Sequence, residues 1–258
     1  MSNLTYLYCV VQRDKPPALA RAPLGVPGAG KPRAIDAGRG LWLIAADAPA
    51  AQYGEEAIGR GLQDLTWVSA RAVPHEGVVE FAGRTGTVLP MKLFTLFRSD
   101  ERALEHVAAQ RKRIDRLLER LAGREEWGLR MLLDEPRAVE RLARSARDEA
   151  KGASGTEFLL RKKKQRDLSR DVRERGTERA TALFDELARR ADDSRRRPPP
   201  AGPQGQRILL DAAFLIRRDR VKPFQAAVRK AAARLSRDGY ELTLSGPWPP
   251  YNFVAESA

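Results

Sequence analysis

Cysteine and histidine are scarce in this sequence. Cys9 is the only cysteine, and His75 and His106 are the only histidines. A single cysteine excludes a disulfide within the chain, and so few histidines and cysteines do not supply the several nitrogen or sulfur ligands of a zinc site. We therefore expect no metal and no other cofactor, and the lone thiol fits a reducing cytoplasm.

Long apolar runs are also missing. The most apolar stretch, ILLDAAFLI, contains Asp211 and is far shorter than the ~20 residues that a membrane-spanning helix needs. The N-terminus lacks the basic segment, apolar core and small-residue cleavage site of a signal peptide. These absences predict a cytoplasmic protein with no membrane partner.

No group of residues has the pattern of a catalytic site. His75 has no recognisable nucleophile as a partner. The segment GVPGAGKP matches the phosphate-loop spacing only up to Pro32, where the motif requires serine or threonine. Proline supplies neither a hydroxyl nor an N–H group, and the segment leads into a predicted strand where the motif requires a helix. We predict that the protein is not an enzyme and has no nucleotide or other small-molecule substrate.

Positive charge is abundant instead. The formal net charge is +13, which favours partners that are polyanions or acidic protein surfaces. Four cations, Arg161, Lys162, Lys163 and Lys164, fall within one predicted helical turn. Acidic residues follow at spacings that pair with arginines along a helix, and no aromatic side chain for base stacking lies between Phe158 and Phe184. The basic run is thus interpreted first as a solvated helix face, with protein docking and nucleic-acid contact as the alternatives.

The length and the pattern of elements indicate two α+β domains divided near Gly123. In the first domain, 1–123, apolar alternation predicts strands at 4–11 and in GLWLIAAD. Helical sequence follows from about 50 to 81, with breaks predicted near Asp64 and Pro74. An extended run containing Pro90 predicts an edge strand or a bulge, and a single helix is expected from Ser99 to Gly123.

The second domain, 124–258, reads as β-α-α-β-α-β. The predicted elements are a strand in EEWGLRMLL, a helix at 136–150, a long charged helix at 156–193, a proline-rich linker at 194–206, a strand in RILLDAAFLIRR, a helix at Val221–Leu235, and a strand in YELTLSG. Gly176 within the long helix predicts a close contact or a bend. This order predicts a modified ferredoxin-like sandwich in which one strand is replaced or rearranged.

The chain ends in an aromatic and proline-rich tail, 245–258, that contains SGPWPPYNFV. Rigid prolines after a strand can hold aromatic side chains outward for a partner at little entropic cost. This makes five residues candidates for protein interaction: Trp248, Pro249, Pro250, Tyr251 and Phe253. The alternative is that Trp248 and Tyr251 fold back as a hydrophobic lid over the domain junction, so Trp248→Ala is expected to damage folding more than partner binding.

Four motifs are spread over essentially the whole chain: YLYCVV, PHEGVVEFAGRTGTVLPMKLFTLF, GREEWGLRMLL and GYELTLSGPWPPYNFV. Together, and in this order, they resemble the GvpF/GvpL family of gas vesicle proteins. The resemblance implies a non-enzymatic accessory or minor component of the gas vesicle. It also implies that the protein binds the small, aggregation-prone shell protein GvpA, works with other gas vesicle accessory proteins in nucleation and assembly, and has two α+β domains, the second modified ferredoxin-like.

The sequence departs from the family pattern at one place. After VLP the family usually has Arg-Phe-Gly-Thr, whereas this chain continues with Met91, Lys92, Leu93, Phe94 and Thr95. Any contact made by the family's arginine is therefore not carried over. A basic nucleic-acid-binding protein remains the alternative function, because of the net charge.

Overall fold

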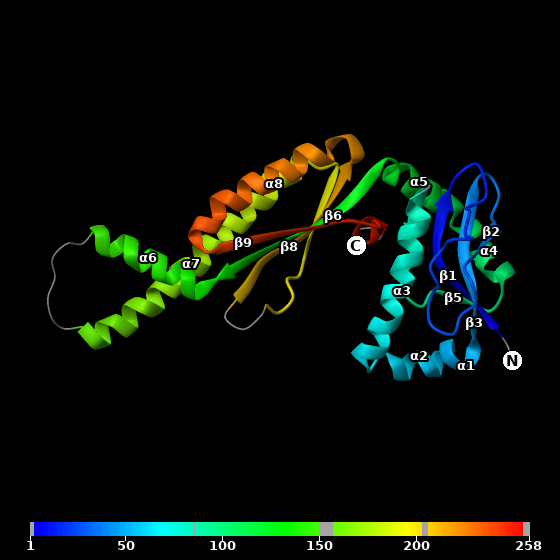
Figure 1. Cartoon of the computed structure of the whole chain (residues 1–258), viewed down its shortest axis with the longest axis horizontal. Helices are drawn as coiled ribbons and strands as arrows, with labels where there is room; N and C mark the ends of the chain where they lie inside the picture. Colours follow the sequence, from blue (N-terminus) through cyan, green and yellow to red (C-terminus); the bar gives the residue numbers. More distant parts are fainter. Residues whose placement is uncertain (1–2, 85, 150–156, 203–205, 255–258) are drawn as a thin grey trace. The chain divides into compact units, whose positions relative to one another are not determined.

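The computed structural model describes residues 3–84, 86–149, 157–202 and 206–254, with side chains omitted at 144–149 and 157–166. The chain forms two compact units, one of Met1–Gly123 together with Trp248–Ala258, and one of Arg124–Pro247 (Figure 1). The sequence predicted that the C-terminal tail belongs to the second domain. The structure instead groups residues from Trp248 onward with the first unit.

The first unit is built on an antiparallel sheet in the order β2-β3-β1-β4, with β5 also paired to β1. Its strands are β1 (Asn3–Gln12), β2 (Arg33–Asp36), β3 (Leu41–Pro49), β4 (Thr87–Pro90) and β5 (Leu96–Phe97). The central strand β1 is buried from Thr5 to Val11, which explains its apolar residues on both faces. Pro90 ends the edge strand β4, as its sequence predicted.

Helices cover both faces of this sheet. They are α1 (Ala50–Tyr53), α2 (Glu55–Gly61), α3 (Leu65–Gly83), α4 (Asp100–Ala109) and α5 (Arg111–Leu121). Helix α3 packs Val78 and Val79 against Tyr6 and Tyr8 of β1, and α4 and α5 lie across the sheet from it (Figure 1). The tyrosines and the apolar stripe of α5 thus fill two separate layers of core.

Two helix boundaries differ from the prediction. Pro74 does not break a helix but lies inside α3, where buried residues on the following two turns keep the helix on the sheet. Asp64 is the N-cap of α3, and its side chain accepts a hydrogen bond of 2.8 Å from the Thr66 N–H. The expected single helix after Ser99 is two helices, because Gln110 has non-helical backbone angles between α4 and α5.

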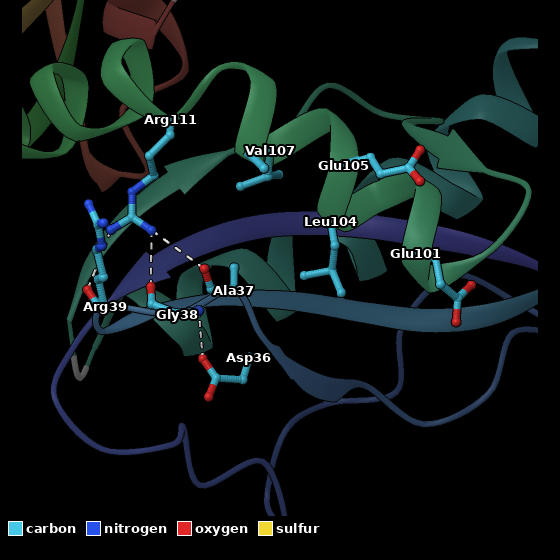
Figure 2. Close-up of a pocket in the computed structure, with 10 residues that line it drawn as sticks. Asp36, Ala37, Gly38, Arg39, Glu101, Leu104, Glu105, Val107 and Arg111 are labelled. Atoms are coloured by element: carbon cyan, nitrogen blue, oxygen red, sulfur yellow. Dashed lines mark hydrogen bonds between the residues drawn. The ribbon is translucent and has the colours of Figure 1, made fainter.

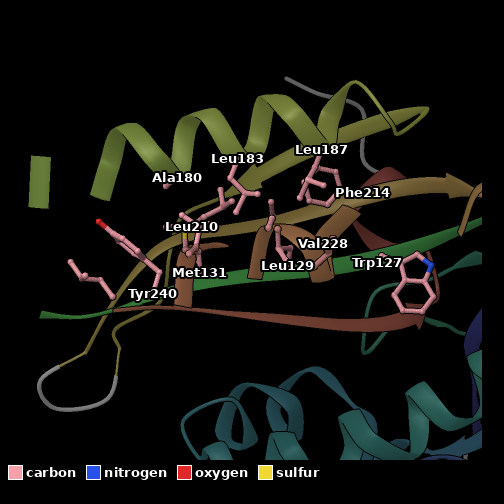
Figure 3. Close-up of a cluster of buried hydrophobic side chains, with 14 of the residues drawn as sticks. Trp127, Leu129, Met131, Ala180, Leu183, Leu187, Leu210, Phe214, Val228 and Tyr240 are labelled. Carbon is pink, nitrogen blue, oxygen red and sulfur yellow. The ribbon is translucent and has the colours of Figure 1, made fainter. Parts of the chain in front are cut away.

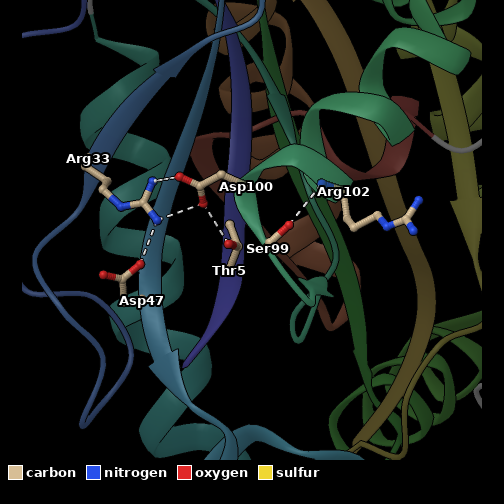
Figure 4. Close-up of polar contacts among 6 residues, drawn as sticks. All are labelled: Thr5, Arg33, Asp47, Ser99, Asp100 and Arg102. Atoms are coloured by element: carbon tan, nitrogen blue, oxygen red, sulfur yellow. Dashed lines mark hydrogen bonds and ion pairs between the residues drawn. The ribbon is translucent and has the colours of Figure 1, made fainter. Parts of the chain in front are cut away.

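An ion-pair network ties the edge of this sheet to the start of α4. Arg33 of β2 donates to both carboxylate oxygens of Asp100, at 2.6 and 2.8 Å, and to Asp47 of β3 at 2.6 Å (Figure 4). Thr5 of β1 donates to Asp100 at 2.7 Å. The Arg33 guanidinium holds the pKa of Asp100 below its ordinary value. The Asp100 carboxylate thereby joins α4 to β1 and β2, and the Arg33 guanidinium adds β3.

The second unit is a four-stranded sheet in the order β7-β8-β6-β9. Its elements are β6 (Arg124–Asp134), α6 (Glu135–Glu149), α7 (Glu157–Ala188), β7 (Asp193–Arg197), β8 (Gln206–Arg217), the 3₁₀ turn Arg218–Arg220, α8 (Val221–Leu235), the 3₁₀ turn Ser236–Asp238, and β9 (Tyr240–Trp248). Strand β8 pairs antiparallel with both β6 and β7. Apart from β7, this is the order of elements that the sequence predicted.

Helices α7 and α8 bury one face of this sheet. The core contains the following buried side chains: Trp127, Leu129, Met131, Leu183, Leu187, Leu210, Phe214, Val228 and Tyr240 (Figure 3). The predicted contact at Gly176 is confirmed, because a Cβ at this position would lie only 2.8 Å from Cδ1 of Leu209. Glycine therefore lets α7 approach β8 closely.

The start of the predicted linker 194–206 is a strand, and this prediction was wrong for residues 194–197. Strand β7 has no apolar residue, and its arginines hold it to the sheet in two ways. Arg197 donates to the buried Asp211 of β8 at 2.6 Å. Arg196 lies with its guanidinium 4.4 Å from the centroid of the Phe184 ring on α7.

Candidate interaction surfaces

The C-terminal tail is part of the packed structure of the first unit. After β9, the Tyr251 N–H donates to the Pro249 carbonyl at 2.8 Å and the Phe253 N–H to the Pro250 carbonyl at 3.0 Å. These bonds begin the short helix α9 (Tyr251–Val254), which contacts β4. Phe253 is fully buried, and both prolines are buried as well. Proline rigidity and one aromatic anchor thus fix Tyr251–Val254 on the sheet.

Only part of the tail faces solvent. Trp248 is 43% exposed, whereas Tyr251 is half-buried. Burial raises the pKa of the Tyr251 hydroxyl, and the neighbouring Glu76 carboxylate raises it further. A partner that meets this conformation can reach Trp248, but not Phe253 or the two prolines.

The basic run lies on α7. Arg161, Lys162, Lys163 and Lys164 belong to the helix, but their side chains are outside the described residues. Further along, α7 cations pair with acids of neighbouring elements: Arg173 with Glu135 at 2.9 Å, and Arg179 with Asp238. These two ion pairs therefore hold α7 to neighbouring elements of the second unit.

His75 has both ring nitrogens occupied inside the first unit. Its Nδ1 accepts from the Tyr6 hydroxyl at 2.9 Å, and its Nε2 donates to the Met91 carbonyl, an acceptor, at 3.2 Å. Burial lowers the pKa of His75 to about 4, so the ring is neutral near pH 7. Since both nitrogens bind protein groups, His75 acts here as a structural link and not as a general base.

The segment that departs from the family pattern is held by the same link. Phe94 has φ +64, in the left-handed region, and its N–H donates to the Tyr6 hydroxyl at 3.2 Å. Its ring packs on Trp67 of α3, with centroids 5.3 Å apart. The family pattern places glycine in this segment, and glycine has no steric penalty at such a φ.

A groove of about 640 Å³ lies between the β2–β3 turn and α4 (Figure 2). Its walls are mostly apolar, with Ala37 facing Leu104 and Val107, and Glu101 and Glu105 at one end. Arg111 closes the other end by donating to the Gly38 carbonyl at 3.0 Å. The residues that line the groove include no nucleophile beside a base, and its mostly apolar walls suit non-covalent contact with another molecule.

Apart from Trp248, the exposed apolar side chains were not expected from the sequence. Among the described residues, the large exposed hydrophobics are these: Leu24, Leu62, Leu65, Val73 and Trp248. Three of them lie on or next to α3. The sequence of α3 does indicate that apolar side chains are exposed there, because the helix has apolar residues on all sides. A single ionisable side chain, Arg71, lies between Asp64 and His75.

Comparison with known proteins identifies the family. The family model described as gas vesicle synthesis protein GvpL/GvpF matches residues 4–255. The chain belongs to the GvpL/GvpF family. This GvpL/GvpF chain is 31% identical to gas vesicle protein L of Streptomyces sp. (strain CB03234), over 98% of the chain and 93% of that protein. It is 26% identical to gas vesicle protein F of the same strain, over 97% and 99%.

Solved structures show the same fold. The crystal structure of gas vesicle protein GvpF from Anabaena sp. PCC7120 matches with a TM-score of 0.72 at 18% identity, covering 100% of this GvpL/GvpF chain and 98% of that one. GvpF from Microcystis aeruginosa matches with a TM-score of 0.67 at 16% identity, covering 99% and 100%. The mixed helix and sheet architecture is therefore that of known gas vesicle proteins.

Two further observations concern the described part of this GvpL/GvpF chain. No helix in it combines the length and apolar character that crossing a bilayer requires. No group of three or more histidine, cysteine, aspartate or glutamate side chains within it is placed to hold a metal ion.

Proposed function

We propose that this GvpL/GvpF family protein binds the shell protein GvpA and assists gas vesicle nucleation and assembly, as an accessory or minor component that prevents GvpA aggregation. The observation that carries the proposal is the family match over residues 4–255. The remaining partners are other gas vesicle accessory proteins. The activity is association and not catalysis.

The exposed apolar side chains support this role. A protein that shields a small hydrophobic subunit needs apolar surface of its own that remains open after folding. Trp248 supplies such surface, and exposed tryptophans are frequent anchors of protein interfaces. Within the tail we assign the direct contact with the partner to Trp248. The role we assign to Pro249, Pro250, Tyr251 and Phe253 is to hold this segment in place. We assign Arg161, Lys162, Lys163 and Lys164 a secondary role against acidic partner surfaces.

Co-expression with GvpA tests the proposal. We expect the full chain to retain GvpA in the supernatant after centrifugation and to co-purify with it through a tag on this chain alone. An unrelated basic protein of similar charge, expressed with GvpA in the same way, is the control. Sedimentation of GvpA to the same extent with either protein would contradict the proposal.

Nucleic-acid binding is the second candidate, and the net charge of +13 is the observation in its favour. Binding through phosphate contacts falls steeply as salt rises, since counterions are released from the nucleic acid. We expect no retention of DNA or RNA at about 50 mM salt, where such contacts are strong. Binding at that salt with a steep loss on raising it would favour the alternative.

We also propose that the two units are separate domains and that the second is a ferredoxin-like sandwich. The order β6-α6-α7-β7-β8-α8-β9 supports this assignment. If α6 and α7 are counted as one helical connection and β7 as a strand, the order is the β-α-β-β-α-β pattern. The proline-rich segment then begins after Arg197. It connects the two middle strands of that pattern in sequence.

A further inference from the structure

The outward side of α8 carries positive charge without acidic residues. From Arg220 to Arg237 the chain has six arginines and lysines and no aspartate or glutamate. Helix α8 packs on the sheet of the second unit beside α7 (Figure 1). Five of its exposed residues, which we call the α8 face, are these: Lys222, Ala226, Arg229, Lys230 and Ala233.

The helical period places the α8 face opposite the core. The buried side chains of α8 belong to the core of the second unit: Phe224, Val228, Ala231 and Leu235. On the exposed side, intervals of four, three and four residues form one stripe of a helix, which here consists of Lys222, Ala226, Arg229 and Ala233. Cations and alanines therefore alternate along the stripe, and Lys230 lies beside it.

The cations of the α8 face form no ion pairs within the described part of the chain. The neighbouring Arg234 does, with Glu186 of α7 at 3.3 Å, but Lys222, Arg229 and Lys230 do not. Helices α4, α5 and α7 differ, because each holds acidic residues with which its own arginines pair. The positive charge of the α8 face is therefore available to a partner.

This placement of charge does not favour the helix itself. Lys222 lies in the first turn of α8, where the helix dipole favours acidic side chains, and that turn contains no acidic residue. Lys230 and Arg234 are four residues apart, a spacing at which like charges on a helix repel each other. These cations thus lower the stability of α8 by itself, and a negatively charged partner would offset that cost.

The composition of the α8 face selects the kind of partner. Phosphates of a nucleic acid could pair with the cations, but the face has no aromatic side chain on which a base could stack. A helix that binds a bilayer carries large apolar side chains that enter the lipid, whereas the apolar residues here are Ala226 and Ala233. An acidic amphipathic helix fits both parts of the face, because its carboxylates meet the cations and its apolar side chains pack on the alanines.

We propose that the α8 face binds an acidic amphipathic helix of a partner protein. Lys222 and Arg229 lie about 10 Å apart along α8, so a helix with carboxylates seven residues apart can contact both. The small side chains of Ala226 and Ala233 let that helix approach closely. Complementary charge selects the partner and speeds its arrival. This inference goes beyond the proposed function, because it requires neither GvpA nor the C-terminal tail.

The test measures binding of the full chain to a fluorescent helical peptide that repeats the heptad Glu-Ala-Ala-Leu-Ala-Ala-Glu. Glutamates and leucines alternate along one side of this peptide, as cations and alanines do on the α8 face. Lys222→Glu/Arg229→Glu reverses two charges of the face, and Lys112→Glu/Arg116→Glu reverses two exposed charges of α5. All four positions are exposed, so thermal unfolding of both variants is expected to match the parent chain.

We expect the α8 variant to weaken peptide binding about tenfold at about 50 mM salt, because attraction becomes repulsion at two positions that contact the peptide. The α5 variant has the same net charge, so its binding shows the effect of overall charge alone. We expect its affinity to remain within about twofold of the parent's, because charges far from a binding site are largely screened by salt.

A crosslinking experiment without a charge change locates the contact. A photoreactive p-benzoylphenylalanine in place of Ala226 is expected to capture the peptide, and the same residue in place of the exposed Ala109 of α4 is not. Equal weakening by the two charge variants, no saturable binding by the parent chain, or no capture from position 226 would overturn the inference. Tighter binding of duplex DNA or of anionic vesicles than of the peptide, lost in the α8 variant, would assign the face to another class of partner and also overturn it. Retention of GvpA is measured separately by co-expression, so failure of one proposal leaves the other standing.

Discussion

His75 and Phe94 fix the segment between β4 and β5 by different means. The neutral imidazole joins the Tyr6 hydroxyl to the Met91 carbonyl, and the same hydroxyl accepts the Phe94 N–H. Phe94 meanwhile adopts a left-handed backbone angle, which is strained for any residue with a Cβ. A buried polar link and an aromatic contact with Trp67 thus hold a conformation that glycine would adopt without cost.

The folded protein is expected to lose stability in mild acid because of His75. Its pKa is about 4 when folded, against an ordinary value of 6.5, so the unfolded chain binds the proton more readily between these values. The stabilisation is complete above pH 6.5 and is lost as the pH falls toward 4. From about pH 7.5 to about pH 5, urea unfolding should show a loss of about 2 kcal/mol from this group.

The matched control is His75→Gln, whose side-chain amide can still donate to the Met91 carbonyl but does not titrate. Its stability should fall less over the same pH interval. An identical pH dependence in the two proteins would show that His75 is not the group responsible.

Substitutions at Phe94 should reverse the usual order of alanine and glycine. Both Phe94→Ala and Phe94→Gly remove the contact with Trp67, but alanine keeps the left-handed strain while glycine relieves it. We expect the glycine variant to be more stable by about 1 kcal/mol, measured by thermal or urea unfolding. An alanine variant as stable as the glycine variant would mean that the segment relaxes away from φ +64.

Among the elements, the sequence revealed the buried strands best. β1, β3, β6 and β8 carry apolar residues along their length, and a buried strand cannot be built otherwise. Strand β7 escaped prediction because DSRRR has no apolar side chain, and its pairing depends on Asp211, which lies 14 residues further along the chain. Pro74 misled the helix prediction for a similar reason, since tertiary burial of α3 outweighs the local cost of proline.

The ion pair that holds β7 can be tested directly. Arg197→Met leaves the buried Asp211 carboxylate with Arg130 at 3.6 Å as its remaining ion-pair partner, and should destabilise the second unit by about 2 kcal/mol. Arg197→Met/Asp211→Asn should recover part of this loss, because the uncompensated charge is gone. Urea unfolding of both variants measures the difference, with the exposed Arg207→Met as the control.

A single variant as stable as the parent chain would show that Arg197 is not what holds the edge strand. Equal loss in the single and double variants would instead assign the effect to packing and not to charge.

At the scale of the whole molecule, the sequence predicted a mixed helix and sheet architecture but not where the residues after Trp248 pack. YNFV has the composition of a loose tail, and nothing local indicates that Phe253 lies buried in the first unit. The exposure of the candidate interaction residues could not be predicted from the local sequence either. The motif identified the family resemblance, whereas the exposure that separates Trp248 from Phe253 depends on contacts far away in the sequence.

Phe253→Ala should therefore destabilise the first unit by about 3 kcal/mol, the usual loss for a large aromatic side chain removed from a core. Trp248→Ala, at a position 43% exposed, should cost clearly less. Hydrogen exchange of the full chain provides the measurement: β1 and β4 should exchange faster in Phe253→Ala, and β8 should not. Faster exchange in β8 alone would contradict the assignment of the tail to the first unit.

The position of Phe253 also sets an order of events during synthesis. Domains generally fold as the ribosome releases them, the N-terminal one first. Here the last core residue of the first unit is translated after every residue of the second. The part of the molecule made first is thus completed only when Phe253 emerges, and a nascent chain leaves the α9 contact on β4 unmade until then.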